Sequence, residues 1–361
     1  MPDAPAPLSL SAASARGDRA SVALWHGGGD VEVTHQPLPW PGPGEAVVAV
    51  TCTTACGCVR RVVEERRFGG APTVLGHEGV GRLLAVGAGV ADVNGAPLAE
   101  GDRVVWLART SCGECRRCRA GDRSACSGAR EIGAEPVADE WTLPGSFASH
   151  LQLPRGAALA RVPDWAPDAL VSPAGCAVAR AVAAVERIGS LAGKRVMVVG
   201  AGLIGLAVTA LAAESGAASC VVVEERSQRR ARALAFGADV ALDPGARLPA
   251  CDVAVVASGA ADSLAPTVGA LATGGSVAVL GPLEAGVAAC DGTRIAKEGL
   301  TVTGVAGTEP RHLAQAVDLL VSTHAVRPWT ELVAAPVPLA RAAAVMMDGG
   351  AGDRRGAVAP A

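Results

Sequence analysis

The chain has 361 residues, 50% of them hydrophobic, and a formal net charge of -3. This length allows two domains, because single hydrophobic cores stop growing near about 250 to 300 residues. The nearly balanced charge argues against nucleic acid or an anionic membrane as a partner and favours a small-molecule substrate.

Residues 1–20 form an Ala/Pro/Ser-rich segment that lacks the basic start and the apolar run of a secretory signal, so we expect a flexible lead-in. No apolar run approaches the roughly 20 residues that cross a bilayer, and the sequence therefore predicts no membrane span. We expect a cytoplasmic location. In that reducing compartment the 11 cysteines suit metal binding, catalysis or core packing better than disulfides.

From residue 21 to about residue 153, short β-type runs alternate with Gly/Pro/Asp turns, which predicts a mainly antiparallel region. The runs are SVALWH, EAVVAVTC, GVGRLLAVG and DRVVWL.

From residue 178 strands and helices alternate, in runs such as KRVMVVG, GLAVTALAAESG, SCVVVEE and DVAVVAS, which predicts a doubly wound parallel sheet. After about residue 319 the elements are short and mixed again. We expect this tail, with a helix in LARAAAVMM and a strand in RGAVAP, to pack on the first region. The predicted domains are 21–177 with 319–361, and 178–318.

The most specific motif is CGECRRCRAGDRSAC, in which one short loop carries Cys112, Cys115, Cys118 and Cys126. Four thiolates can close a tetrahedron around zinc, each sulfur about 2.3 Å from the metal, and such a closed set is structural. An iron–sulfur cluster is the alternative. The ferredoxin pattern, however, has a shorter final gap and a following proline, whereas Ser127 follows Cys126 here.

A second motif, VMVVGAGLIG, places Gly200, Gly202 and Gly205 between an apolar strand and a helix. In this GxGxxG order the first glycine permits a tight turn, the second lets the backbone approach a pyrophosphate, and the third allows close helix–strand packing. The helix N-terminus favours the negative charge of the pyrophosphate. The motif therefore predicts a dinucleotide site.

Glu224 ends the next predicted strand. A carboxylate there can accept hydrogen bonds from the ribose hydroxyls and would repel a 2′-phosphate, which favours NAD. Arg226, Arg229 and Arg230 follow, and a guanidinium can accommodate that phosphate, so NADP remains the alternative. These arginines can equally form a solvated helix face.

A dispersed set consists of Cys56 in VTCTTACGCVRR, the pair His77-Glu78 in VLGHEGVG, and Cys176 in SPAGCAVA. A catalytic zinc takes about three protein ligands and keeps one open position, and two cysteines with one histidine are known in alcohol oxidation. Each of these residues can also be an ordinary core residue, and sequence alone does not show that they meet.

The order Cys-Gly, Gly-His-Glu, four-cysteine loop, then Gly-Cys ahead of GAGLIG resembles the zinc-binding medium-chain alcohol dehydrogenases over nearly the whole chain. The stretches PAGCAVARAVAAVERIG, GSFASHLQLP and TEPRHLAQAVDLL are similar to the branch found with phosphonate-metabolism genes. The resemblance implies an α/β fold with a GroES-like, mainly β catalytic domain and a Rossmann domain. It also implies a homodimer or homotetramer.

The same resemblance implies roles for individual residues. Cys56, His77 and Cys176 match the catalytic zinc ligands, and Glu78 matches the acid beside the metal, so the family pattern carries two zinc ions per chain. The matching dinucleotide contacts are Gly200, Gly202, Leu203, Ile204, Gly205, Glu224 and Arg229.

The chain departs from the family after Cys56-Gly57. The family usually has Ser or Thr, then Asp, and often His two residues later; this chain has Cys58, Val59 and Arg61. In the family the hydroxyl and the His pass the alcohol proton to solvent, and the Asp orients the zinc-bound His. Cys58 can donate and accept weakly, but Arg61 cannot act as a base. Arg61 and Arg109 can hold a substrate anion or be surface charges.

The sequence therefore predicts a zinc-dependent, NAD-linked dehydrogenase of a small alcohol, with a phosphonate-bearing or otherwise anionic substrate as an extension. One alternative is an NADPH-linked reductase of an aldehyde, ketone or activated double bond. A second alternative is a non-catalytic dinucleotide-binding protein with structural zinc only. Two zinc ions per chain would support catalysis, and one would support the non-catalytic protein.

Overall fold

The computed structural model describes residues 19–65, 71–260, 262–281, 290–348 and 353–360. The chain divides into two units. The first comprises Met1–Ala120, Cys126–Ser172 and Val333–Ala361, and the second comprises Gly121–Ala125 and Pro173–Leu332. Most of the expected lead-in lies outside the described residues, and the first strand, β1, begins at Arg19.

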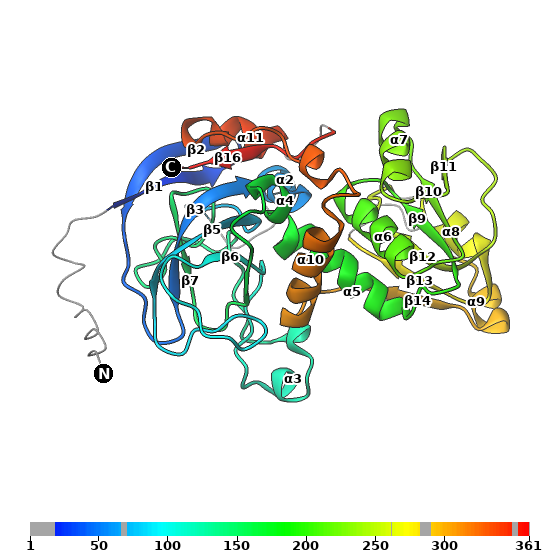
Figure 1. Cartoon of the computed structure of the whole chain (residues 1–361), viewed down its shortest axis with the longest axis horizontal. Coiled ribbons are helices and arrows are strands. Elements are labelled where there is room, and N and C mark those ends of the chain that lie inside the picture. The colour runs from blue at the N-terminus through cyan, green and yellow to red at the C-terminus, as the bar shows by residue number, and fades with distance from the viewer. Residues whose placement is uncertain (1–18, 66–70, 261, 282–289, 349–352, 361) are drawn as a thin grey trace. The chain divides into compact units, whose positions relative to one another are not determined.

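The first unit contains a seven-stranded sheet in the order β15-β16-β3-β5-β6-β8, with β7 also paired to β3 (Figure 1). All pairs are antiparallel except β15 with β16. The strands are β3 (Ala46–Thr54), β5 (Gly79–Val86), β6 (Arg103–Trp106), β7 (His150–Leu153), β8 (Leu159–Arg161), β15 (Val337–Pro338) and β16 (Ala357–Ala359). The predicted antiparallel region is therefore present.

A smaller sheet in the same unit has the order β2-β1-β4, from β1 (Arg19–Gly27), β2 (Asp30–Pro37) and β4 (Thr73–Val74). The helices of this unit are short: α2 (Gly57–Glu65), α3 (Arg116–Arg119), α4 (Asp168–Val171), η4 (Leu339–Arg341) and α11 (Ala342–Asp348). Apolar side chains of β3, β5 and β6 form the main core together with Trp106 and Trp141.

The second unit is built on a parallel six-stranded sheet in the order β11-β10-β9-β12-β13-β14 (Figure 1). The strands are β9 (Arg195–Val199), β10 (Ser219–Val223), β11 (Val240–Leu242), β12 (Cys251–Val256), β13 (Leu271–Val279) and β14 (Thr301–Gly304). The chain order reverses between β9 and β12, and in such sheets ligands bind at this reversal, outside the carboxyl ends of the strands. The predicted doubly wound sheet is therefore present.

Helices connect these parallel strands and pack on the sheet, because a parallel crossover needs a long connection. The connecting helices are α6 (Leu203–Glu214), α7 (Ser227–Ala235), α8 (Leu264–Ala270) and α9 (Gly292–Glu298). The same unit also contains η1 (Arg123–Ala125), η2 (Ala174–Val178), α5 (Ala179–Ile188), α10 (Pro310–Thr323) and η3 (Trp329–Leu332). Helices α5 and α6 pack against each other and against the sheet.

The unit boundaries differ from those expected from the sequence. The second unit begins at Pro173 and not at residue 178, because Ala174–Val178 is a π-helical turn that continues directly into α5. It ends at Leu332 and not at residue 318, because α10 runs unbroken to Thr323. Cys176 therefore lies in the second unit, and not in the first region where the sequence pattern placed it.

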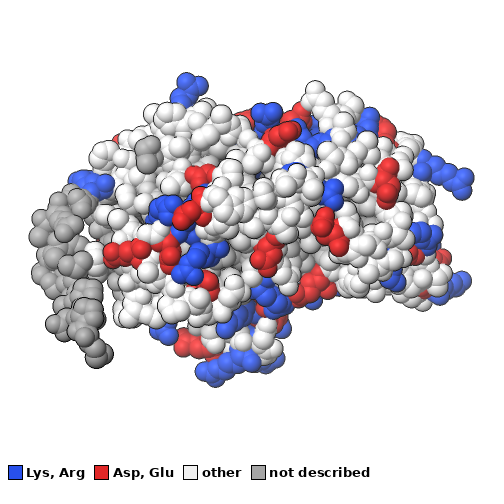
Figure 2. Space-filling model, viewed as in Figure 1, with Lys and Arg blue, Asp and Glu red and all other residues white. Residues whose placement is uncertain are grey.

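One helical stretch, Asp168–Ile188, is long and apolar enough to cross a membrane, and 78% of its most apolar window is buried inside the protein. Such burial is typical of a core helix, because a lipid-facing helix would expose its apolar side chains. On the face shown in Figure 2, basic and acidic side chains are interspersed.

Candidate metal and dinucleotide sites

Cys56 and His77 are brought together by a contact between two chain segments of the first unit. Cys56 lies between β3 and α2, and His77 lies in the turn between β4 and β5. The Thr54 N–H donates to Glu78 O at 2.8 Å, and Thr53 Oγ1 donates to the same carbonyl at 3.1 Å. These bonds align the end of β3 with the start of β5. Cys56, which follows β3, therefore lies beside His77, which precedes β5.

Cys56 Sγ and His77 Nε2 lie 3.2 Å apart, and the Cys58 Sγ joins them in a group whose ligand atoms are all within 4.8 Å of one another. Burial opposes protonation of His77, but the Cys56 and Cys58 thiols raise its pKa well above the usual value. Two soft sulfurs and one imidazole nitrogen form a donor set that suits zinc. The residues present therefore fit a zinc ion.

Glu78 follows His77 in the chain and is fully buried. Its Oε1 accepts hydrogen bonds from Thr54 Oγ1 at 2.5 Å and from Arg355, whereas Oε2 is buried without a hydrogen-bond partner among the described residues. An unpartnered buried carboxylate oxygen is costly. Glu78 thus carries an unsatisfied acceptor next to His77 in the chain, but its oxygens are not among the clustered ligand atoms.

Cys58 and Arg61 lie on α2, the helix that follows Cys56. Both are half-buried, whereas Val59, Val62 and Val63 of the same helix are buried in the core. Cys58 and Arg61 are three residues apart, so they share one side of the helix. Cys52 lies elsewhere: it is buried on β3 and is not part of the metal-ligand group.

Glu131 is a site residue that the sequence pattern did not suggest. It forms an ion pair with Arg109, whose Nε lies 2.9 Å from Glu131 Oε1. Burial raises the pKa of Glu131, and Arg109 and His77 act in the opposite direction. Arg109 also donates to Cys126 O at 3.2 Å. Both contacts are long-range, and no sequence signal could have paired these residues.

The four cysteines of the loop converge as their spacing predicts, and all their sulfurs lie within 4.8 Å of one another. Cys112 Sγ is 3.4 Å from Cys126 Sγ, and Cys115 Sγ is 4.0 Å from Cys126 Sγ. Tetrahedral zinc with bonds of about 2.3 Å places its sulfurs about 3.8 Å apart. The loop therefore fits a zinc ion bound by four sulfurs.

Backbone N–H groups of the loop point at these sulfurs. Cys112 N–H donates to Cys126 Sγ at 3.2 Å, and Cys115 and Cys118 N–H donate to Cys112 and Cys115 Sγ, both at 3.4 Å. Bonds from the N–H groups of Cys118 and Ser127 lower the pKa of Cys115 to about 5. Burial raises the pKa of Cys118 to about 12. The donors stabilise thiolates, which are the ligand form of cysteine.

In the second unit the three glycines of the GxGxxG turn have the geometry that the motif requires. Gly200 has a φ of 98°, which L side chains rarely adopt, and a Cβ on Gly205 would lie 1.8 Å from Gly200 O. Gly202 is the N-cap of α6, and a Cβ there would meet nothing within 4 Å. Leu203 and Ile204 form the first turn of α6. The open space at a helix N-terminus fits a pyrophosphate.

Glu224 follows β10 and is buried, with 7% of its surface exposed. Its Oε2 accepts from Ala201 N–H at 2.8 Å, and its Oε1 accepts from Arg226 N–H at 3.0 Å. Arg230 donates to Glu224 O at 2.7 Å and to Asp243 Oδ2 at 3.1 Å, so it anchors the turn. Arg229 lies on α7 and is half-buried.

Arg311, in the TEPRHL stretch, does not offer a free charge to an anion. It donates to Glu186 at 2.6 Å and 3.0 Å and also contacts Glu309. His312 Nδ1 accepts from Glu309 N–H at 2.9 Å in a capping box, and its Nε2 lies 3.1 Å from Glu186. This stretch therefore begins α10 and fixes it to α5.

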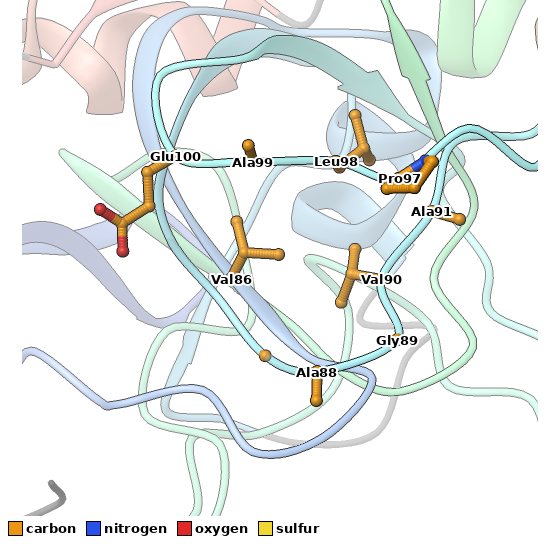
Figure 3. Close-up of a pocket in the computed structure, with 10 residues that line it drawn as sticks. Val86, Ala88, Gly89, Val90, Ala91, Pro97, Leu98, Ala99 and Glu100 are labelled. Atoms are coloured by element: carbon orange, nitrogen blue, oxygen red, sulfur yellow. The ribbon is translucent and has the colours of Figure 1, made fainter. Parts of the chain in front are cut away.

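A hollow at the surface of the first unit is lined by neither cysteine nor histidine (Figure 3). Two runs line it, residues 86–91 and 97–100, and Glu100 is its one ionisable side chain. With no metal-ligating sulfur or imidazole and a single carboxylate, it lacks the convergent polar groups of a reaction site.

Comparisons with known proteins agree with this geometry. Residues 42–164 match the family model described as alcohol dehydrogenase GroES-like domain, and residues 204–322 match that described as zinc-binding dehydrogenase. An L-threonine 3-dehydrogenase of Saccharopolyspora erythraea is 30% identical over 296 residues, which cover 77% of this chain and 81% of the relative.

Two solved structures show the same fold. An alcohol dehydrogenase from Thermotoga maritima matches with a TM-score of 0.88 at 22% identity, over 96% of this chain and 100% of that chain. A putative zinc-binding dehydrogenase from Sinorhizobium meliloti 1021, bound to NADP, matches with a TM-score of 0.82 at 25% identity, over 95% and 100% of the two chains.

Proposed function

Since the chain belongs to the zinc-binding medium-chain dehydrogenase family and is an NAD(P)-linked zinc oxidoreductase, we propose that it interconverts a small alcohol and its aldehyde or ketone with NAD as cofactor. The observation that carries this proposal is the donor set of Cys56 and His77, whose sulfur and Nε2 atoms lie 3.2 Å apart. In the family pattern Cys176 of the second unit is the third ligand.

Different residues would bind the metal, hold the metal-binding segment in position and bind the cofactor. Cys56 and His77 would hold zinc, which as a Lewis acid polarises the substrate oxygen and favours loss of its proton. Glu78, held by Thr54 and Arg355, would anchor the segment that carries His77. The turn at Gly202 would bind the pyrophosphate of NAD, which when bound would supply the hydride acceptor.

NAD is proposed because both oxygens of the buried Glu224 carboxylate lie at the end of β10, where ribose hydroxyls bind in such sheets. NADP remains the alternative, because the similar structure from Sinorhizobium meliloti 1021 is bound to NADP and Arg229 follows on α7. A preference for NADPH would favour the reductase function that the sequence left open.

A phosphonate-bearing or otherwise anionic substrate needs an arginine whose charge no carboxylate balances. Arg109 pairs with Glu131, and Arg311 pairs with Glu186, so both charges are already balanced by carboxylates. Only Arg61, on the same helix side as Cys58, still supports an anionic substrate. The relatives named for threonine suggest that an amino alcohol belongs in the same assay.

Zinc quantification and nicotinamide absorbance assays test this function together. The purified chain should contain two zinc ions and reduce NAD faster than NADP with at least one small alcohol from a panel that includes neutral, amino and phosphonate-bearing alcohols. One zinc per chain and no turnover of any alcohol or carbonyl compound with either cofactor would support the non-catalytic alternative. Unchanged KM values in Arg61→Ala would remove the anionic extension.

A further inference from the structure

Cys58 is placed with the metal donors and not apart from them. Its Sγ lies within 4.8 Å of the Cys56 sulfur and of the His77 ring nitrogen. The Cys58 thiol is also within hydrogen-bonding reach of His77. Cys58 is half-buried, whereas Val59, Val62 and Val63 of the same helix are buried in the core.

The local backbone explains how two cysteines of a Cys-Gly-Cys sequence reach one point. Cys56 O accepts the Val59 N–H at 3.0 Å, so Cys56 caps α2 and Cys58 lies in its first turn. A Cβ on Gly57, between them, would meet nothing within 4 Å. The N-terminus of a nine-residue helix favours thiolates over thiols, because its unpaired N–H groups carry partial positive charge.

Cys52 provides an internal comparison. It lies four residues before Cys56 on β3, is 2% exposed and is absent from the ligand group. Burial raises the pKa of Cys52 to about 12, which keeps it a neutral thiol. Three cysteines thus lie within one short segment, and the fold directs two of them, Cys56 and Cys58, toward His77.

We propose that Cys58 is a further thiolate ligand of the metal held by Cys56 and His77. The inference rests on the proposed function only in that a metal binds at this cluster. The first unit then presents two sulfurs and one nitrogen from Cys56, Cys58 and His77. Because catalytic zinc can expand to five-coordinate, a fourth protein ligand still leaves room for the substrate oxygen. This set binds soft divalent metals more tightly than one thiolate and one imidazole would.

Cobalt substitution and X-ray absorption can count the sulfurs directly. The holoprotein is prepared with Co²⁺ or Zn²⁺ in the wild type and in Cys58→Ser, Cys58→His, Cys56→Ser and Cys52→Ser, all under reducing conditions. The loop contributes the same four sulfurs in every variant. Any change in the sulfur-to-cobalt charge-transfer band or in the zinc–sulfur count therefore reports on the Cys56 cluster, which consists of Cys56, Cys58 and His77.

Cys58→Ser should lose as much charge-transfer intensity as Cys56→Ser and bind the cluster metal at least about tenfold more weakly, because even outer partners of a metal site are worth about 10 to 100-fold in affinity. Cys58→His should lose the same intensity but retain the metal count. Cys52→Ser should match the wild type. The loop's own cobalt bands show that each variant is folded.

A Cys58→Ser spectrum identical to that of the wild type would overturn the ligand assignment, whatever happens to activity. If the wild type is active with nicotinamide cofactors and this spectrum is unchanged, the proposed function stands and the ligand proposal fails. If the wild type binds two metals without activity and Cys58→Ser loses a sulfur, the ligand proposal stands and the proposed function fails. A wild type that binds metal only in the loop contradicts both.

Discussion

The four-cysteine loop and the Cys56 cluster lie in the same unit, but the chain builds them in opposite ways. The loop takes four ligands from one segment, Cys112 to Cys126, and its own backbone N–H groups stabilise the sulfurs. The cluster joins β3 and α2 to the turn before β5 through the Thr54–Glu78 bonds. A local site is complete in itself, whereas a site joined from distant segments depends on the fold.

The donors of the two regions differ in a way that matches their roles. Four sulfurs close a coordination sphere and leave no place for a substrate. The Cys56 cluster mixes sulfur with imidazole. We therefore expect loss of the loop metal to lower the free energy of unfolding and loss of the cluster metal to lower the catalytic activity.

The largest expected effect on stability comes from Cys126→Ser. Cys126 is 1% exposed and accepts the Cys112 N–H, so its loss should release the loop metal and lower the free energy of unfolding by about 4 kcal/mol or more. Denaturant unfolding measures this. Cys290→Ser, a half-buried cysteine outside both clusters, is the control and should stay near the wild type. Equal stability of Cys126→Ser and Cys290→Ser would show that the loop metal does not stabilise the fold.

His77→Ala should lower activity more than stability, in contrast to Cys126→Ser. Because it removes a proposed ligand, kcat/KM should fall by at least about 100-fold, the upper end of the loss seen for outer partners of a metal site. Its melting temperature should change less than that of Cys126→Ser. His35→Ala, at an exposed histidine of β2, is the control. Wild-type activity in His77→Ala would leave the cluster without a catalytic role.

Glu131→Gln should have a smaller effect, because it removes one charge of a half-exposed ion pair worth up to about 1 kcal/mol. We expect a change in kcat/KM of about fivefold or less and an unchanged zinc content. Asp164→Asn, which breaks the exposed pair with Arg82, should leave kcat/KM unchanged. If both variants behave alike, Glu131 does not influence the reaction.

The smallest effect should come from Glu186→Gln, far in sequence from both metal regions. Hydrogen bonds from Arg311 lower the pKa of Glu186 to about 2, with a further contribution from His312. A lowered pKa in the folded state stabilises the protein above the ordinary carboxyl pKa, and the contribution is lost as pH falls through about 2. Because Glu186 is half-exposed, the loss at neutral pH should be below about 1 kcal/mol.

The measurement for Glu186→Gln is the difference in unfolding free energy from the wild type as a function of pH. The difference should shrink as pH falls below about 4.5, the ordinary value for this carboxyl. A difference that grows toward acid pH would have the wrong sign for this ion pair. If Glu186→Gln lowered the free energy of unfolding as much as Cys126→Ser, the loop metal would not stabilise the protein more than this ion pair does.

The sequence predicted the regions whose geometry is local. The spacing of Cys112 to Cys126 and the glycines at 200, 202 and 205 each lie within one turn or loop, so the pattern itself determines which atoms meet. The alternation of strands and helices likewise predicted the parallel sheet. The two units divide at Pro173 and after Leu332, whereas the sequence pattern places the changes at residues 178 and 319, because η2 continues directly into α5 and α10 runs on to Thr323.

Contacts between distant segments could not be predicted in this way. Glu78 and Arg355 are 277 residues apart in the sequence, and Glu131 approaches Arg109 across an isolated β-bridge. Cys58 was interpreted as a replacement for a relay hydroxyl because the family has Ser or Thr there; the structure shows its sulfur beside Cys56 and His77. Arg109 was a candidate anion contact, but the structure pairs it with Glu131.

The zinc content of the wild type, His77→Ala and Cys126→Ser, measured side by side by mass spectrometry, tests the separation of the two regions most directly. The account predicts two zinc ions per chain in the wild type and one in each variant, with activity lost in His77→Ala and stability lost in Cys126→Ser. One zinc in the wild type, or two in His77→Ala, would contradict it.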